Sequence, residues 1–412
     1  MGQIYAGIDL GTNSIKIVVC EKFENTFHVL AAVSNKSMGI KNGQIVDTKM
    51  AVTSVRKTVK QINDMLGIKL TKVIAAVPPT DCNMDIVMGT TDVIDYDEIT
   101  GEDVRNVLKD ALSTHIGADK EIITACPINF TVDDEKNIKD PKGKAGKVLE
   151  TKVVVSTLDK EPLYRILEVL KLSGLETVDV AFSSTGDYYT VKNKNRDNTV
   201  GAIINIGELT TNVSVYNKGI QIKNAVIPLG SINVDKDLSY VFKLSNEDCC
   251  YLKENFAVCV SSYADNNDVY DGVTAAGEKK EITQVGVSKV VEARIAEILN
   301  LAKNKIKSLT NREIHYIIIT GGLSELAGFQ YMVENIFGVD AKVCNISAMG
   351  IRHNKYSSVY GVIKYFDDKL NLRGKTYDMI SENDREILEA ADQKVAVNDN
   401  ILSKVFGHFF DN

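Results

Sequence analysis

The sequence predicts an α/β protein built from two similar halves. Its 412 residues are more than one hydrophobic core normally holds, so two or more lobes are expected. Residues 3–20 and 199–216 each read as an apolar strand, a polar turn containing glycine and threonine, and a returning strand rich in β-branched residues. Residues 316–329 add a buried type of strand that ends in Gly321-Gly322 and opens a helix.

Composition and charge narrow the classes of protein that fit. The formal net charge is −7 and no basic block occurs, which disfavours nucleic-acid binding. No apolar run approaches the ~20 residues that a membrane-spanning helix requires. The start of the chain has no basic segment leading into an apolar one, so we do not expect a secretion signal. The seven cysteines contain no CxxC pair, which indicates neither a zinc site nor a disulfide framework and fits a reducing cytoplasm.

The first turn has the residue types expected around a phosphate group. Gly11 lets backbone N–H groups approach phosphate oxygens, because a Cβ would obstruct that approach. Thr12 and Asn13 add polar side chains, and Lys16 adds a positive charge. Asp9, just before the turn, can hold a magnesium ion through water. The turn therefore predicts a site for a nucleotide with Mg2+.

The second turn and the Gly-Gly strand end extend this prediction. A Gly-Gly at the start of a helix lets a purine lie flat against the backbone. Each pattern alone is usually only a hairpin or a strand end, whereas all three in this order are much more specific. The alternative is a cleft that binds no nucleotide and serves only as a hinge. The candidate nucleotide-binding residues are Asp9, Gly11, Thr12, Asn13, Lys16, Asn205, Gly207, Thr210, Thr211, Gly230, Lys253, Gly321, Gly322 and Leu323.

The order of these motifs resembles the two-lobed ATPase fold of actin, sugar kinases and heat-shock chaperones (ASKHA), in which two lobes enclose ATP. Within this superfamily, nearly the whole chain resembles the FtsA family of bacterial division proteins, which tether FtsZ filaments to the membrane. The resemblance rests on the opening IDLGTNSIKIVV and on the segments Glu98–Leu108, Lys120–Gly146, Ile227–Phe242 and Glu292–Ile306. It implies an actin-like fold with an inserted subdomain called 1C.

The resemblance also implies a division of the chain into domains. The first lobe, or subdomain 1A, would comprise residues 1–82, 161–198 and 353–380. The second lobe, or subdomain 2A, would comprise residues 199–235 and 313–352. Subdomain 1C would span residues 83–160, and an FtsZ-binding subdomain, 2B, would span residues 236–312. Residues 381–397 would form a linker, and residues 398–412 an amphipathic membrane-targeting helix.

The second turn departs from the pattern of this fold, which usually begins with an acid there. Asn205 stands in that place, and an amide cannot accept a proton as a general base. Glu208 brings a negative charge near the expected phosphates, and Ser231 and Cys250 replace a usual glycine and glutamate. We therefore expect ATP or ADP to bind with Mg2+ and ATPase activity to be weak or absent, and we assign no catalytic residue.

A helix over residues 287–309 carries the candidate partner site. Its apolar side would contain Val290, Ile295, Ile298, Leu299 and Ile306. Its polar face is of a kind that is most often simply solvated. The resemblance implies that this helix contacts the C-terminal peptide of FtsZ, and the candidate contact residues are Arg294, Asn300 and Lys303.

The last fifteen residues, 398–412, read as an amphipathic helix whose large apolar side chains lie on one stripe: Ile401, Leu402, Val405, Phe406, Phe409 and Phe410. The acidic stretch Ser381–Gln393 before it is poorly suited to a core. Such a tethered stripe needs a lipid surface or a protein groove to cover it. The alternative is a terminal helix docked on its own domain.

Together these features predict a cell-division protein that binds ATP and polymerises into a filament. It would anchor FtsZ to the cytoplasmic side of the cell membrane at the division site, as a peripheral membrane protein. The alternatives are an actin-like pilus-assembly ATPase and a nucleotide-binding scaffold that does not polymerise. A sugar or acetate kinase would need a catalytic aspartate between the lobes, and the sequence offers no convincing candidate.

Overall fold

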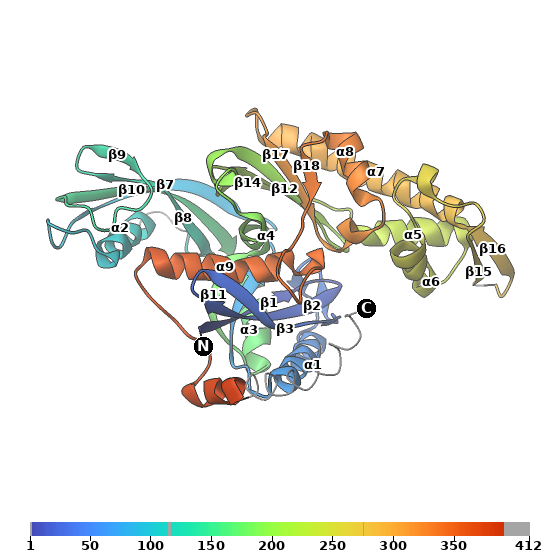
Figure 1. Ribbon diagram of the computed structural model, residues 1–412, viewed down its shortest axis with the longest axis horizontal. Helices are drawn as coiled ribbons and strands as arrows, with labels where there is room; N and C mark the ends of the chain where they lie inside the picture. The colour runs from blue at the N-terminus through green and yellow to red at the C-terminus, as the bar shows by residue number, and fades with distance from the viewer. Residues whose placement is uncertain (1, 114–116, 275, 391–412) are drawn as a thin grey trace, which may run out of the picture.

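The computed structural model describes residues 2–113, 117–274 and 276–390, and two five-stranded sheets organise it. The first has the order β3 (Thr26–Lys36), β2 (Ser14–Phe23), β1 (Gln3–Leu10), β6 (Lys72–Val77) and β11 (Glu176–Phe182). The second has the order β14 (Ile220–Ile227), β13 (Thr211–Asn217), β12 (Val200–Ile206), β17 (Tyr316–Thr320) and β18 (Ala341–Val343). In both, the first three strands pair antiparallel and the next two join in parallel. The structure thus confirms the two similar halves (Figure 1).

The first lobe buries its sheet between helices. Strand β1 is apolar on both faces because it lies in the middle of the sheet. Helix α1 starts where the Asp47 carboxylate accepts a hydrogen bond from the Met50 N–H, and it ends at Gly67, whose φ is +69°. The helices and short strands of this lobe are α1 (Thr48–Leu66), α3 (Lys160–Leu172), α4 (Ser183–Val191), α9 (Ser357–Leu372), β4 (Ile40–Lys41) and β5 (Gln44–Ile45).

The second lobe has a separate hydrophobic core under its longest helix. That helix begins three residues before the predicted segment, because the Thr283 hydroxyl caps it, and it buries Ile295, Ile298, Leu299 and Ile306 as predicted. Val290 lies outside the fully buried row. The elements beside the sheet are α5 (Ser231–Phe242), α6 (Asn246–Tyr251), β15 (Val269–Val273), β16 (Lys279–Thr283), α7 (Gln284–Leu309) and α8 (Phe329–Phe337).

A third unit projects from the first lobe on the side away from α7 (Figure 1). Its four-stranded antiparallel sheet has the order β7 (Asn83–Asp92), β10 (Val148–Asp159), β8 (Lys120–Val132) and β9 (Glu135–Ile138). Helix α2 (Gly101–Ser113) covers this sheet, and the unit has a core of its own. The outer strand β7 leaves Ile86 and Met88 more than half exposed.

Two segments differ from the sequence-based expectation. Residues 382–390, assigned to a linker, form a helix on the first lobe: Leu388 is buried, and Arg385 donates a hydrogen bond to the Gly2 carbonyl. Leu388 belongs to the core of the first lobe, although the sequence around it is acidic. After Gly321 the chain forms only a short 3-10 turn, η4 (Gly322–Glu325), because Gly328 takes a φ of +77° before α8 begins.

The first lobe is closed by a contact between the backbones of α4 and α9. A Cβ built on Gly361 would lie 1.7 Å from the Gly186 carbonyl oxygen, and a Cβ on Gly186 would lie 2.1 Å from the Ser358 carbonyl oxygen. Only glycine therefore allows the two helices to approach this closely. The contact holds the first residues of α9 beside α4.

Substituting Gly361→Ala should force α4 and α9 apart. We expect the apparent Tm to fall by roughly 3–10 °C, because overpacking costs about 1–3 kcal/mol. Gly286→Ala is the matched control, since its Cβ would meet no atom closer than Thr283 Oγ1 at 3.2 Å. Thermal unfolding followed by circular dichroism measures both, and equal Tm values for the two variants would contradict the close contact.

Candidate functional site

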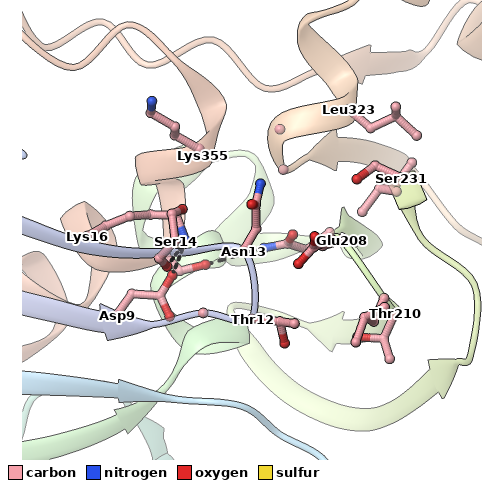
Figure 2. Close-up of a pocket in the computed structure, with 18 of the residues that line it drawn as sticks. Asp9, Thr12, Asn13, Ser14, Lys16, Glu208, Thr210, Ser231, Leu323 and Lys355 are labelled. Carbon is pink, nitrogen blue, oxygen red and sulfur yellow. Dashed lines mark hydrogen bonds and ion pairs between the residues drawn. The ribbon is translucent and has the colours of Figure 1, made fainter. Parts of the chain in front are cut away.

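A cavity of about 750 Å3 lies where the two lobes meet. The turn between β1 and β2, the turn between β12 and β13, and the Gly321-Gly322 strand end all line it (Figure 2). The structure therefore brings the three predicted glycine-containing segments to one space. We call the β1–β2 turn, the β12–β13 turn and the Gly321-Gly322 strand end the first, second and third glycine corners. The predicted residues that line it are Asp9, Gly11, Thr12, Asn13, Lys16, Asn205, Gly207, Thr210, Lys253, Gly321, Gly322 and Leu323.

Two predicted residues lie behind the cavity wall. Thr211 is fully buried, and its hydroxyl donates a hydrogen bond to the Leu229 carbonyl at 2.8 Å. Gly230 packs against the second turn, where a Cβ would lie 2.4 Å from the Glu208 carbonyl oxygen. These two residues shape the second turn, and its neighbour Ser231 reaches the cavity instead.

The first corner is held by an ion pair. Lys16 Nζ lies 2.8 Å from Asp9 Oδ2 and also donates to the Ser14 carbonyl at 3.3 Å. A Cβ on Gly11 would come within 2.8 Å of that carbonyl oxygen and 2.9 Å of Lys16 Nζ. Asp9 and Lys16 face each other directly across the β1–β2 register. The hairpin thus holds one acidic and one basic side chain at the cavity wall.

The third corner packs against the second. Gly321 has a φ of +96°, and a Cβ there would lie 2.3 Å from the Ile206 carbonyl oxygen and 2.8 Å from Asn205 Oδ1. A Cβ on Gly322 would meet no atom within 4 Å, so its backbone faces open space. Glycine is required at the first position by geometry, and at the second it leaves a flat wall for a ligand.

Lys355 is a cation of the cavity that sequence reasoning missed. It lines the wall above Lys16 in Figure 2 and is the middle residue of the short 3-10 helix η5 (Asn354–Tyr356). Burial lowers the pKa of Lys355, and the positive charge of Lys16 lowers it further. An anion between the two lysines would relieve this repulsion. A single lysine in a polar loop gives no sequence signal that it lines a cavity.

The second corner contains an acid whose charge is disfavoured. Burial raises the pKa of Glu208, while the positive charge of Lys253 opposes that rise. Lys253 is itself almost fully buried and forms an ion pair with Asp235 at 2.8 Å. Cys250 lines the same wall, and its Sγ lies 3.5 Å from Glu254 Oε1, so a carboxylate stands one helical turn after the expected position.

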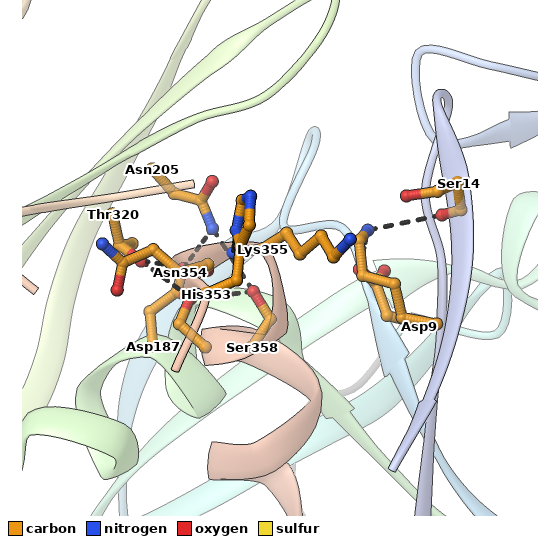
Figure 3. A network of polar contacts seen from close by, with 11 residues as sticks. Asp9, Ser14, Asp187, Asn205, Thr320, His353, Asn354, Lys355 and Ser358 are labelled. Carbon is orange, nitrogen blue, oxygen red and sulfur yellow. Dashed lines mark hydrogen bonds and ion pairs between the residues drawn. The ribbon is translucent and has the colours of Figure 1, made fainter. Parts of the chain in front are cut away.

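A buried carboxylate behind the cavity, Asp187, is the second residue that sequence reasoning missed. It is 2% exposed and accepts three hydrogen bonds of 2.7 Å, from Asn205 Nδ2, Ser357 Oγ and Ser358 Oγ (Figure 3). Thr320 donates in turn to Ser357 Oγ at 2.8 Å. Burial raises the pKa of Asp187 to about 6, against the opposing effect of these hydrogen bonds. The three donors favour the ionised form of Asp187 despite its burial.

The wall suits a nucleotide better than a metal ion held by protein alone. Glycine backbones form cradles that a Cβ would fill, and Asn354, 3% exposed and lining the cavity, has an amide oxygen without a hydrogen-bond partner. Across residues 2–390 apart from 114–116 and 275, no group of three or more histidine, cysteine or acidic side chains could hold a metal. A magnesium ion here would depend on phosphate oxygens and water, beside Asp9.

The predicted partner residues on α7 are all engaged within the chain. The Arg294 guanidinium binds Asp237 through Nε and through Nη2, the latter at 3.0 Å, and also pairs with Glu297. The Asn300 amide donates to the Ala296 carbonyl at 2.8 Å. Lys303 donates to the Ile336 carbonyl.

A groove of about 350 Å3 lies next to the Arg294–Asp237 pair, between α5 and α7. Val290, predicted for the apolar side of the helix, is partly buried: it packs against the core and also lines this groove. Tyr240 is 77% exposed at its edge. Of the predicted partner residues, only Arg294 lies beside it, through its contact with Asp237. The lining residues are Asp237, Tyr240, Val241, Lys289, Val290 and Ala293.

The predicted membrane residues Ile401, Leu402, Val405, Phe406, Phe409 and Phe410 lie outside the described residues. Among the helices that the structure does describe, none combines the length and the apolar character needed to cross a bilayer.

Comparison with solved structures shows the class of fold. The PilM–PilN type IV pilus biogenesis complex matches with a TM-score of 0.60 at 12% identity, over 88% of this chain and 98% of that one. MreB5 of Spiroplasma citri bound to ADP matches with a TM-score of 0.54 at 12% identity, over 89% and 97%. These neighbours show that the chain has the actin-like ATPase fold.

Comparison with protein families shows the lineage. A family model described as "Cell division protein FtsA" matches residues 202–361, and one described as "SHS2 domain inserted in FTSA" matches residues 82–157. The "Cell division protein FtsA" of Bacillus subtilis (strain 168) is 26% identical over 400 residues, which cover 96% of this chain and 89% of that protein. Since the two models together match more than half of the residues and such relatives match nearly all of them, the chain belongs to the FtsA family of cell division proteins.

Proposed function

We propose that this chain binds ATP or ADP with Mg2+ between its lobes and hydrolyses ATP slowly or not at all. The observation that carries the proposal is the convergence of the three glycine corners on one cavity. The actin-like neighbour MreB5 was solved with ADP, which favours the same class of ligand for this fold. Lys16 and Lys355 both line the cavity and add positive charge of the kind that a polyphosphate needs.

The cavity is better arranged for holding a nucleotide than for activating water. In the proposed complex, backbone N–H groups near Gly11 and Gly207 meet the phosphates, and Lys16 and Lys355 offset their charge. Magnesium would draw electron density from the phosphate oxygens. Asn205 cannot take a proton from water, and Asp9 is held in its ion pair with Lys16. The absence of a carboxylate at position 205 therefore supports binding without rapid hydrolysis.

Substituting Lys16→Ala should weaken nucleotide binding by about tenfold, because it removes a cation and leaves Asp9 as an unpaired negative charge facing the phosphates. Lys144→Ala, which breaks an exposed ion pair with Glu135 far from the cavity, is the matched control. Fluorescence anisotropy of a labelled ADP measures both. Absence of binding by the unaltered protein would contradict the nucleotide site, and release of phosphate at about 1 per second or faster would contradict slow hydrolysis.

We further propose that the groove between α5 and α7 binds the C-terminal peptide of FtsZ. The groove offers apolar contact from Tyr240, Val241 and Val290 beside the charges of Arg294 and Asp237. Tyrosine and arginine are among the residues enriched at the energetically dominant positions of protein interfaces. Because Asp237 already binds Arg294, a peptide carboxylate must share or exchange that partner, which favours reversible binding.

Substituting Tyr240→Ala or Arg294→Ala should each weaken binding of a labelled FtsZ C-terminal peptide by about fivefold or more, since each removes a central contact. Tyr331→Ala on α8 is the control, because Tyr331 is also exposed and lies outside the groove. Isothermal titration calorimetry gives the dissociation constants. If both groove variants bind as tightly as the control, the peptide docks elsewhere.

Self-association and membrane attachment complete the proposal. The exposed Ile86 and Met88 on β7 give the inserted unit an apolar surface that suits contact with another copy. Six apolar side chains of the tail, each half buried in a bilayer surface, would contribute about 5–9 kcal/mol, and ordering the tail offsets much of this. Lys404 adds about 1 kcal/mol of attraction to anionic lipid. One copy would therefore bind weakly, and a filament would bind firmly by multivalency.

Deletion of residues 398–412 should abolish pelleting with phosphatidylglycerol-containing vesicles in the presence of ATP and leave the Tm unchanged, because only the tail supplies the lipid contact. Phe406→Asp should reduce pelleting strongly, whereas Ser403→Asp, the matched control on the polar side, should reduce it little. Vesicle cosedimentation measures all three. Equal pelleting with and without the tail would contradict its role.

A further inference from the structure

The amide of Asn205 is held in one orientation by its neighbours. Its Nδ2 lies 2.7 Å from Asp187 Oδ2 and 3.3 Å from Ser358 Oγ. An ionised carboxylate only accepts hydrogen bonds, so the amide nitrogen must face Asp187. Figure 3 shows the nitrogen of Asn205 on the side of Asp187 and the oxygen on the opposite side.

The free face of this amide belongs to the cavity. Asn205 lines the cavity, whereas Asp187 does not. The Asn205 amide oxygen lies 2.8 Å from the position that a Cβ on Gly321 would take, at the junction of the second and third corners. In this orientation the corner offers a hydrogen-bond acceptor. With the amide reversed, it would offer an N–H donor in the same place.

The acceptor at this corner matters for the ligand. Water bound to a magnesium ion is polarised and donates hydrogen bonds, so it is stabilised by an oxygen acceptor and repelled by an N–H donor. A nucleotide phosphate has the opposite requirement. The amide orientation therefore decides whether this corner favours a hydrated cation with the nucleotide or the phosphates alone.

We propose that Asp187 is a positioning residue of the nucleotide site: its buried carboxylate fixes the Asn205 amide with the oxygen toward the cavity, where it accepts hydrogen bonds from water of a magnesium–nucleotide complex. This inference rests on the proposed nucleotide binding. An acid is usual at the end of β12, where Asn205 stands. The inference is that Asp187, in α4, supplies that negative charge instead.

The surroundings of Asp187 suit this role. Its other oxygen accepts from Ser357 and Ser358 at the start of α9, which leaves Oδ2 for Asn205. The Gly186–Gly361 contact fixes α4 against α9, so these donors cannot move away independently. Burial raises the pKa of Asp187 to about 6, while its three hydrogen-bond donors favour the anionic form. The cavity thus gains an uncharged acceptor, the Asn205 oxygen, and the negative charge of Asp187 lies behind it.

The test compares nucleotide affinity with and without magnesium. The magnesium gain is the dissociation constant of labelled ADP in EDTA divided by that in Mg2+. Asp187→Asn keeps the shape of the side chain, but its amide can offer either its N–H or its oxygen to Asn205 and so no longer fixes the orientation of Asn205. We therefore expect the magnesium gain to fall by about fivefold to tenfold, while the affinity for ADP in EDTA changes by less than about twofold. The control is Asp197→Asn, which removes a carboxylate bonded to the Tyr188 hydroxyl outside the cavity lining.

Exchanging the two groups provides a rescue. Asn205→Asp alone places two carboxylates in contact and should lower both Tm and affinity. The double variant Asp187→Asn with Asn205→Asp rebuilds an amide–carboxylate pair with the acceptor toward the cavity, so the gain should return to within about twofold of the unaltered protein. Should Asp187→Asn fail to fold, the comparison of Asn205→Asp with the double variant decides the same question.

Three results would overturn the inference. An unchanged magnesium gain in Asp187→Asn would show that the amide is oriented without the carboxylate. An equal loss of affinity with and without Mg2+ would show that Asp187 only holds the lobes together. A double variant whose magnesium gain is no larger than that of Asn205→Asp would show that the amide–carboxylate pair does not set the gain. Absence of ADP binding by the unaltered protein would instead overturn the proposed function, and this inference with it.

Discussion

The contact between α4 and α9 is the constraint on which the cleft depends. Because Gly186 and Gly361 have no side chains, the start of α9 lies against α4, and Ser357 and Ser358 reach Asp187. The second lobe in turn bonds to the same helix: the Tyr216 hydroxyl donates to the Ser184 carbonyl, and Asn205 donates to Asp187. Helix α4 is thus where three separate stretches of chain are brought into register.

The two ion pairs at the cavity each lie within a single lobe. The Asp9–Lys16 pair lies within the first lobe and the Asp235–Lys253 pair within the second, so a change in the angle between the lobes separates neither pair. The polar contacts that do cross between lobes at α4 are hydrogen bonds. Asn205 to Asp187 joins an amide to a buried carboxylate, and it ties the shape of the nucleotide corner to the relative position of the lobes.

Much of the fold, but only part of the site, could be predicted from the sequence. The two hairpins and the Gly-Gly strand end were recognisable because glycine, alternation and β-branched residues are local signals. Asp187 and Lys355 were not, because their importance arises from residues far away along the chain, such as Ser357 and Lys16. The burial of Leu388 and the position of Val290 at the groove were not foreseen for a related reason: which side of a helix is covered depends on its neighbours.

The segment that leads to the proposed membrane tail and the proposed peptide groove lie on different lobes. The helix of residues 382–390 rests on the first lobe through Arg385 and Leu388. Helices α5 and α7, which line the groove, lie on the side of the second lobe away from the inserted unit (Figure 1). In the proposed tether, tension between the tail and a filament bound in the groove would pass through both lobes. The close packing of α4 on α9 would then resist that pull, and nucleotide occupancy would become sensitive to force.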